Sequence, residues 1–245
     1  MRFLCIDTSA GAGVGLVDID QSVEVLAKEV IADQRRHAEA LNELIRRVVK
    51  QGSGKELAEA GIETIAVGTG PAPFTGLRAG MVSARVIGEV LDARVLGICS
   101  LDVLARQALD QVRDRKVLVA TDGKRKEVYA GLYEAAGPDD VTALWGPEVG
   151  PAESFFNKSR GEDPFIVGAG AELYPEALPP SAQLADTLDP VVMARIGAAR
   201  LAREAGGEEV DFSSEPLYLR RPDIHPGVAA KVAAAQKGRL GLLNE

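Results

Sequence analysis

Carboxylates at the ends of two predicted strands are the side chains of this sequence best suited to chemistry. Asp7 ends a short apolar run and is followed by Thr8 and Ser9, and Asp122 ends a second apolar run of the same kind. In α/β proteins that handle phosphate, carboxylates and hydroxyls in such turns hold a metal ion and phosphate groups. Aspartate and serine also satisfy backbone groups of turns, so a phosphate site and a purely structural role both stay open at this point.

A segment rich in glycine and proline, residues 68–78, leads into a predicted helix that ends near residue 91. The start of such a helix exposes backbone N–H groups that can bind an anion. The segment lacks the lysine of a P-loop and the spacing of a dinucleotide-binding fingerprint. Small residues recur at every fourth position of the helix: Gly76, Gly80, Ala84 and Gly88. Because a glycine inside a helix costs about 1 kcal/mol relative to alanine, we expect a close neighbour along this stripe, either the chain's own sheet or a partner helix.

Histidine and cysteine are too few for a metal centre built from these residues. His37 is followed by Leu41, not by a second histidine, at the fourth position, and His225 lies between prolines far along the chain. Paired metal ligands on a helix need that spacing, so we expect no metal site. Cys5 and Cys99 lie in or beside apolar strands, which is typical of small core residues and not of nucleophiles. We therefore expect neither the histidines nor the cysteines to act in catalysis.

The overall charge argues against broad electrostatic capture of nucleic acid or anionic lipid. The 245 residues include 36 acidic and 28 basic side chains, which give a formal charge of −8. The local basic clusters that could contact nucleic acid are residues 124–126 and 220–221. No apolar run is long enough for a membrane span or a signal segment. We expect a cytoplasmic chain with no membrane partner.

The pattern of apolar residues predicts an α/β protein of two units. Residues 1–113 have the predicted order βββαβαβα, with strands at 3–6, 14–19, 22–31, 64–67 and 94–98 and helices that begin at 37, 76 and 100. Residues 114–222 begin again with a strand, an aspartate, a turn and a return strand, which fits a structural duplication but also fits the common strand–turn–strand arrangement. A short strand near 164–167 and a helix over 191–205 follow, and residues 223–245 form a tail.

Five segments, in this order, resemble one known family. They are residues 4–9, residues 37–39, residues 68–71 with 74–80, Asp122 with residues 127–129, and residues 216–220. Together they are similar to the TsaB (YeaZ) family of bacterial tRNA threonylcarbamoyladenosine proteins, over residues 1 to about 222. The resemblance implies an actin-like, sugar-kinase-like (ASKHA) ATPase fold of two RNase H-like halves, the second reduced.

The resemblance also implies a role as an accessory subunit without catalysis of its own. Members of the family bind the paralogous transferase TsaD, which moves a threonylcarbamoyl group onto the adenosine beside the tRNA anticodon, and the ATPase TsaE joins the assembly. This chain would then meet tRNA indirectly, and its N-terminal helices would bind TsaD or a second copy of the chain. The implied interface residues are Ala38, Leu41, Leu44, Ile45, Gly76, Leu77, Gly80, Met81, Ala84, Ile87 and Gly88. We expect Gly80→Leu or Ala84→Arg to block docking and leave the chain folded.

Nucleotide binding is a further expectation from the resemblance. The turn at Gly168 and Gly170 is similar to the adenosine-binding turn of actin-like kinases, so the candidate nucleotide residues are Asp7, Thr8, Ser9, Asp122, Gly168 and Gly170. We expect no cofactor of the chain's own, and ATP or ADP at the assembly interface. The alternative function is an ATP-dependent phosphotransferase that uses Asp7 and Asp122. A metalloprotease is a remote alternative, because Leu41 replaces the second metal-binding histidine of the catalytic paralogue.

Overall fold

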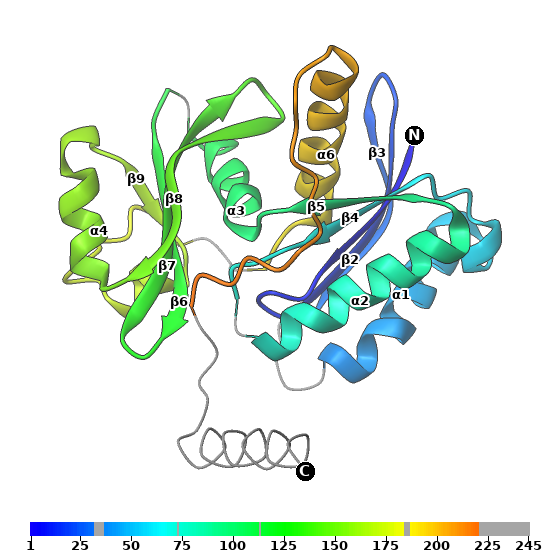
Figure 1. Cartoon of the computed structure of the whole chain (residues 1–245), viewed down its shortest axis with the longest axis horizontal. Coiled ribbons are helices and arrows are strands. Elements are labelled where there is room, and N and C mark those ends of the chain that lie inside the picture. The colour runs from blue at the N-terminus through cyan, green and yellow to red at the C-terminus, as the bar shows by residue number, and fades with distance from the viewer. Residues whose placement is uncertain (32–36, 73, 113, 184–186, 221–245) are drawn as a thin grey trace, which may run out of the picture.

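Two sheets face each other across a central helix (Figure 1). The structure is a computed structural model that describes residues 1–31, 37–72, 74–112, 114–183 and 187–220, without the side chains of residues 37–39, 74 and 75. Within these residues, no helix has the length and apolar character needed to cross a membrane.

The first sheet has five strands in the order β3-β2-β1-β4-β5. Its strands are β1 (Arg2–Asp7), β2 (Ala12–Ile19), β3 (Val23–Ile31), β4 (Thr64–Gly68) and β5 (Arg94–Ile98). β1 pairs antiparallel with β2 and parallel with β4. β1 and β4 are buried along almost their whole length. Helices cover both faces of the sheet, which explains why these two strands read as continuous apolar runs.

Helices pack on each face of the first sheet. α1 (His37–Ser53) and α2 (Phe74–Leu91), with the short 3-10 helix η1 (Leu57–Glu59) between them in the chain, cover one face, where Leu44 and Leu77 meet Ile6 of β1. α6 (Pro190–Ala205) covers the other face, where Met193 joins Cys5 in the core, and α3 (Ser100–Leu109) packs against α6 and the second sheet. Because successive side chains of β1 point to opposite faces of the sheet, they contribute to two separate cores.

The second sheet has four strands in the order β8-β7-β6-β9. They are β6 (Val117–Lys124), β7 (Glu127–Ala136), β8 (Asp140–Gly150) and β9 (Phe165–Val167). α4 (Ala152–Ser159), the short 3-10 helix η2 (Arg160–Glu162) and α5 (Ala169–Leu173) follow β8 and β9. Phe155 of α4 packs on the outer face, and Tyr133 of β7 points inward to the cluster that contains Leu104 of α3. One continuous core thus joins the two sheets through α3.

The order βββαβαβα predicted for residues 1–113 is confirmed element by element. Each sheet has three antiparallel strands in the order 3-2-1 and then a parallel fourth strand, and the second sheet stops there. This is the predicted actin-like arrangement of two RNase H-like halves, with the second half reduced. The tail, residues 223–245, lies outside the described residues.

The C-terminal part of the described chain returns to the first half. α6 packs against the strands of the first sheet, so by contact it does not belong with residues 114–222 as a unit. Its half-buried Arg200 binds Asp102 of α3 at 2.7 Å and Asp140 of β8 at 3.0 Å, which ties the helix to both halves. The periodicity of a helix shows that it has an apolar face but not which sheet that face will cover.

A segment that we call the strap, residues 207–220, then crosses from the first half to the second (Figure 1, orange). The N–H of Gly97 donates to Phe212 O at 3.1 Å, and the N–H of Leu217 donates to Thr69 O at 2.9 Å. At its end, Arg220 donates to Gly123 O at 3.2 Å near the end of β6. The strap therefore connects β5, the segment after β4, and the second sheet.

Candidate functional site

A cleft of about 420 Å³ opens between the two halves, where β1 and β6 end. Its polar lining consists of Ser9, Ser100, Thr121, Asp122, Lys124 and Glu172, and the rest of the lining is apolar. The fold therefore brings the turn after β1 and the end of β6 to the walls of one cavity.

Asp7 is buried beside this cleft, with 3% of its surface exposed. Its Oδ2 accepts hydrogen bonds from the backbone N–H of Ser9 at 3.0 Å and from Ser9 Oγ at 2.7 Å. Its Oδ1 has no hydrogen-bond partner among the described residues and points at β4, because a Cβ on Gly68 would lie 1.9 Å from it. Burial raises the pKa of Asp7 to about 6, and the hydrogen bonds from Ser9 oppose this rise.

Thr8 holds helix α2 against the first sheet. The backbone N–H of Gly80 donates to Thr8 Oγ1 at 3.2 Å, and a Cβ on Gly80 would lie 2.5 Å from that same oxygen. Only glycine at this position lets the hydroxyl reach the helix backbone. The Thr8 side chain is therefore used in packing between β1 and α2, and it does not line the cleft.

Asp122 is in the cleft wall, but its carboxylate is already bound. Oδ1 accepts from the backbone N–H of Lys124 at 2.8 Å, and Oδ2 pairs with Lys124 Nζ at 2.5 Å. With Asp7 turned toward β4 and Asp122 paired with a lysine, the two carboxylates do not present a shared set of oxygen ligands to a metal-bound nucleotide. Among the described residues there is also no group of three or more His, Cys, Asp and Glu side chains that could hold a metal ion.

The two glycines of the predicted adenosine-binding turn let α5 pack on β6. Gly168 has a φ of +102°, and a Cβ on it would lie 2.4 Å from Ala120 O. A Cβ on Gly170 would lie 2.8 Å from the backbone of Ala120 and Thr121. This close packing accounts for both glycines without a ligand, and their part in nucleotide binding stays a prediction.

The small-residue stripe of α2 faces the chain's own sheet, which decides between the two alternatives that the sequence left open. Ala84 is fully buried, and a Cβ on Gly88 would lie 2.5 Å from a methyl group of Val95. The prediction that Gly80→Leu or Ala84→Arg would leave the chain folded is therefore wrong, because both side chains would be forced into a filled core.

The other predicted interface residues are mostly core residues as well. Five of them are buried between α1, α2 and the first sheet: Leu41, Leu44, Ile45, Leu77 and Met81. Gly76 and Ile87 are half-buried, and the side chain of Ala38 lies outside the described residues, as does His37. His225 and Arg221 also lie outside them.

The exposed face of α2 is the feature that the sequence analysis missed. Val82, Val86 and Val90 follow one another at four-residue spacing and are 60%, 57% and 72% exposed. We call these three residues the valine face. The spacing was visible in the sequence, but a helix that is apolar on both sides can be assigned to the core in either orientation.

The two cysteines are core residues, as predicted. Cys5 is fully buried in β1, and Cys99 is half-buried at the start of α3. Burial raises the pKa of both thiols well above its ordinary value, so the thiolate form is suppressed. Neither thiol has the character of a nucleophile.

Similarity to known proteins covers most of this chain. Residues 24–149 match a family model described as TsaD, tRNA N6-adenosine threonylcarbamoyltransferase. An uncharacterized protein of Mycobacterium tuberculosis is 34% identical over 223 residues, which are 91% of this chain and 93% of that protein. The chain belongs to the TsaD/YeaZ family.

Relatives whose names state a function lie further away within the TsaD/YeaZ family. The tRNA threonylcarbamoyladenosine biosynthesis protein TsaB of Haemophilus influenzae is 24% identical over 197 residues, 76% of this chain and 81% of that protein. The structure of YeaZ from Pseudomonas aeruginosa superposes with a TM-score of 0.69 at 26% identity and covers 89% of this chain and 99% of that one. The family resemblance seen in the five sequence segments is thus confirmed.

Proposed function

We propose that this chain is an accessory subunit that binds a TsaD-type transferase through helix α2 and supports the transfer of a threonylcarbamoyl group to tRNA. The observation that carries the proposal is the valine face. Three apolar side chains in line on one helix form a seam that another helix can cover. Arg85 and Glu89 lie beside them and are exposed, which is the polar rim that such an interface needs.

The names of the relatives support the transferase as the partner. The matched family model is named for the transferase, and the relatives called TsaB are named for biosynthesis of the same modified nucleoside. This chain shares a fold with the transferase, but its described residues include no cluster of metal ligands. This combination fits the supporting role better than the catalytic one.

The cleft favours this role over an ATP-dependent phosphotransferase. Phosphoryl transfer needs carboxylates and a metal ion placed around the phosphates, and here Oδ1 of Asp7 faces Gly68 while Asp122 is paired with Lys124. We keep ATP or ADP as a ligand of the assembled interface, TsaE as a further member of the assembly and a cytoplasmic location as predictions. We also predict that the chain alone forms a homodimer through the valine face and that the transferase displaces the second copy.

The experiment is co-purification of this chain with the TsaD-type transferase of the same organism, followed by size-exclusion chromatography. We expect Val86→Lys to weaken complex formation at least tenfold, because a charge at the centre of an apolar seam is desolvated without a partner. Val23→Lys is the matched control, since Val23 is exposed to a similar degree (42%) but lies on β3. Equal binding by both variants and the parent chain would contradict the proposal.

A further inference from the structure

The turn between β6 and β7 carries long basic side chains where the backbone favours small residues. Lys124 pairs with Glu127, so Arg125 and Lys126 form a two-residue hairpin turn. Lys124, Arg125 and Lys126 have φ values of +60°, +57° and +64°. Turns of this type favour Asn-Gly, because a Cβ crowds the backbone at positive φ. The geometry of the turn therefore does not explain these residues, whereas a need for charge at the tip does.

The tip is positively charged in a chain that is acidic as a whole. Residues 122–127 together with Arg220 contain four basic and two acidic side chains, a net charge of +2, while the chain carries −8. The two carboxylates are matched, since Asp122 pairs with Lys124 and Glu127 pairs with Arg220. Arg220 also binds Gly123 O, so the strap holds the tip in place. Arg125 and Lys126 are exposed at its end.

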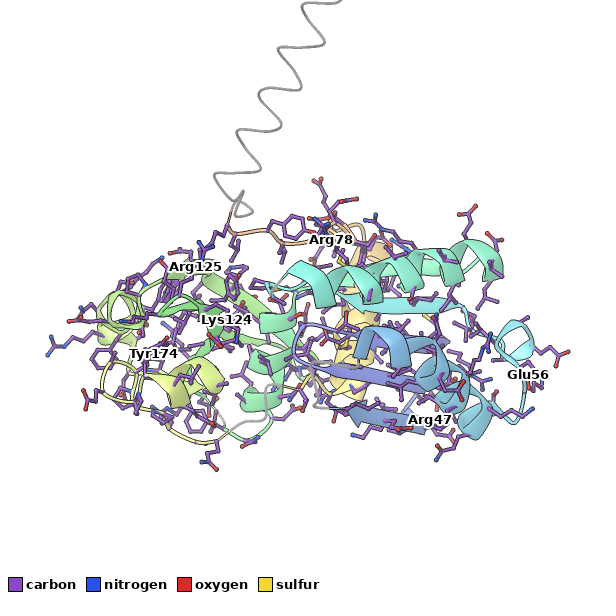
Figure 2. The ribbon with its side chains drawn as sticks, turned by 90° about the horizontal axis from the view of Figure 1, so that it is seen from below. Arg47, Glu56, Arg78, Lys124, Arg125 and Tyr174 are labelled. Carbon is purple, nitrogen blue, oxygen red and sulfur yellow. The ribbon has the colours of Figure 1, made fainter. Side chains whose placement is uncertain are left out.

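An exposed aromatic ring lies next to this tip along the strap. Tyr218 is two residues before Arg220 and is 38% exposed. Arg78 of α2 donates from Nε to Tyr218 Oη at 2.7 Å, and its guanidinium lies 5.6 Å from the centre of the ring. Figure 2 shows Arg78 and Arg125 along the same edge of the molecule, with the strap between them. Basic side chains interleaved with an exposed aromatic ring are the combination that binds unpaired RNA.

The position of these residues connects them to the proposed interface. We call Arg78, Lys124, Arg125, Lys126, Tyr218 and Arg220 the basic ridge. Arg78 precedes Val82 by one helical turn, so the ridge begins where the valine face begins. A partner docked on the valine face would therefore lie beside the basic ridge.

We infer that the basic ridge contacts the RNA substrate of the assembly. Arg125 and Lys126 contact backbone phosphates, and the ring of Tyr218, held by Arg78, stacks on an unpaired base. The inference rests on the proposed function, because it takes tRNA as the substrate of the partner. It assigns to this chain a direct RNA contact, whereas the sequence predicted an indirect one.

The test uses a double substitution that keeps the turn and removes its charge. R125N/K126G introduces the residues that this turn type favours. K55A/R160A is the matched control, since it removes two exposed basic side chains elsewhere. Binding of a fluorescently labelled unmodified tRNA transcript is measured by anisotropy at several salt concentrations, for the full chain alone and for its complex with the transferase.

We expect R125N/K126G to weaken tRNA binding about tenfold at low salt, and to reduce the slope of log Kd against log salt by about two, because each lost phosphate contact removes about one unit. K55A/R160A leaves both quantities unchanged. Tyr218→Ala weakens binding about tenfold with an unchanged salt slope, and Tyr218→Phe restores most of it, since the ring is kept.

Equal affinity and equal salt slope for R125N/K126G and the parent chain would overturn the inference. Size-exclusion chromatography with the transferase separates this outcome from a failure of the proposed function. If the parent chain does not bind the transferase, the proposed function fails and the titration of the chain alone still decides whether the ridge binds tRNA.

Discussion

The two halves of the molecule share one local plan, a strand that ends at an aspartate and continues through a turn into a return strand, and they use it in opposite ways. In the first half, Asp7 is buried against Gly68, and the next residue, Thr8, anchors α2. In the second half, Asp122 is half-exposed and pairs with Lys124 at the base of a basic turn. The turn after β1 is packed into the core, whereas the turn after β6 exposes charged side chains to solvent.

The residues that pack around each turn cause this difference. Glycines at two positions let β4 and α2 approach the turn after β1 closely, which takes its polar groups out of water. The turn after β6 lies at the end of a hairpin, and its residues 124–126 are exposed. An aspartate at the end of a strand is therefore a weak sign of catalysis until the elements that cover it are known.

The first prediction concerns the buried turn, where we expect a large loss of stability. Gly68→Ala places a Cβ 1.9 Å from Asp7 Oδ1 and should lower the free energy of unfolding by about 3 kcal/mol. Gly161→Ala is the control, because no neighbouring atom lies within 4 Å of a Cβ there. Urea denaturation followed by circular dichroism measures both. A Gly68→Ala chain as stable as the control would show that the first turn is not packed as described.

The second prediction contrasts the two aspartates through pH. The pKa of Asp7 is about 6 in the folded chain against 3.8 for the free side chain, so the folded chain binds more protons than the unfolded chain between these pH values. The free energy of unfolding therefore falls as the pH rises from about 4 to about 6. Asp7→Asn should raise it by about 3 kcal/mol at pH 7.5 and leave it nearly unchanged near pH 4.

Asp122→Asn is the comparison variant for Asp7→Asn. Asp122 forms an exposed ion pair, which contributes less than about 1 kcal/mol. Its substitution should change the free energy of unfolding at pH 7.5 by no more than this. If Asp122→Asn stabilised the chain as much as Asp7→Asn, the contrast between a buried and a solvated turn would be incorrect.

The smallest expected effect concerns the backbone of the exposed turn. R125N/K126G relieves positive φ values at two positions and should raise the free energy of unfolding by about 0.5–1 kcal/mol. Thermal and urea denaturation measure this change. A clear loss of stability would mean that the basic side chains stabilise the fold, and not that they serve an external partner.

Local patterns were enough to predict the elements of the first half and the family. Alternating and continuous apolar runs marked the strands, periodicity marked α1 and α2, and the strand that ends at Asp122 indicated the second half. These features depend on residues close together in the chain. The small residues of α2 were also visible, but small residues suit a neighbouring sheet and a partner helix equally well.

What the sequence by itself determined is the order of the elements in the first half, the repeat of the strand–aspartate–turn pattern in the second half, and the core positions of the two cysteines. Only the tertiary structure decided that the small-residue stripe faces the sheet, that the valine face is exposed, and that the strap joins α2 to the basic turn. The physical reason is that these outcomes depend on contacts between distant residues. Gly80 meets Thr8 across 72 positions of the chain, and Arg220 meets Gly123 across 97.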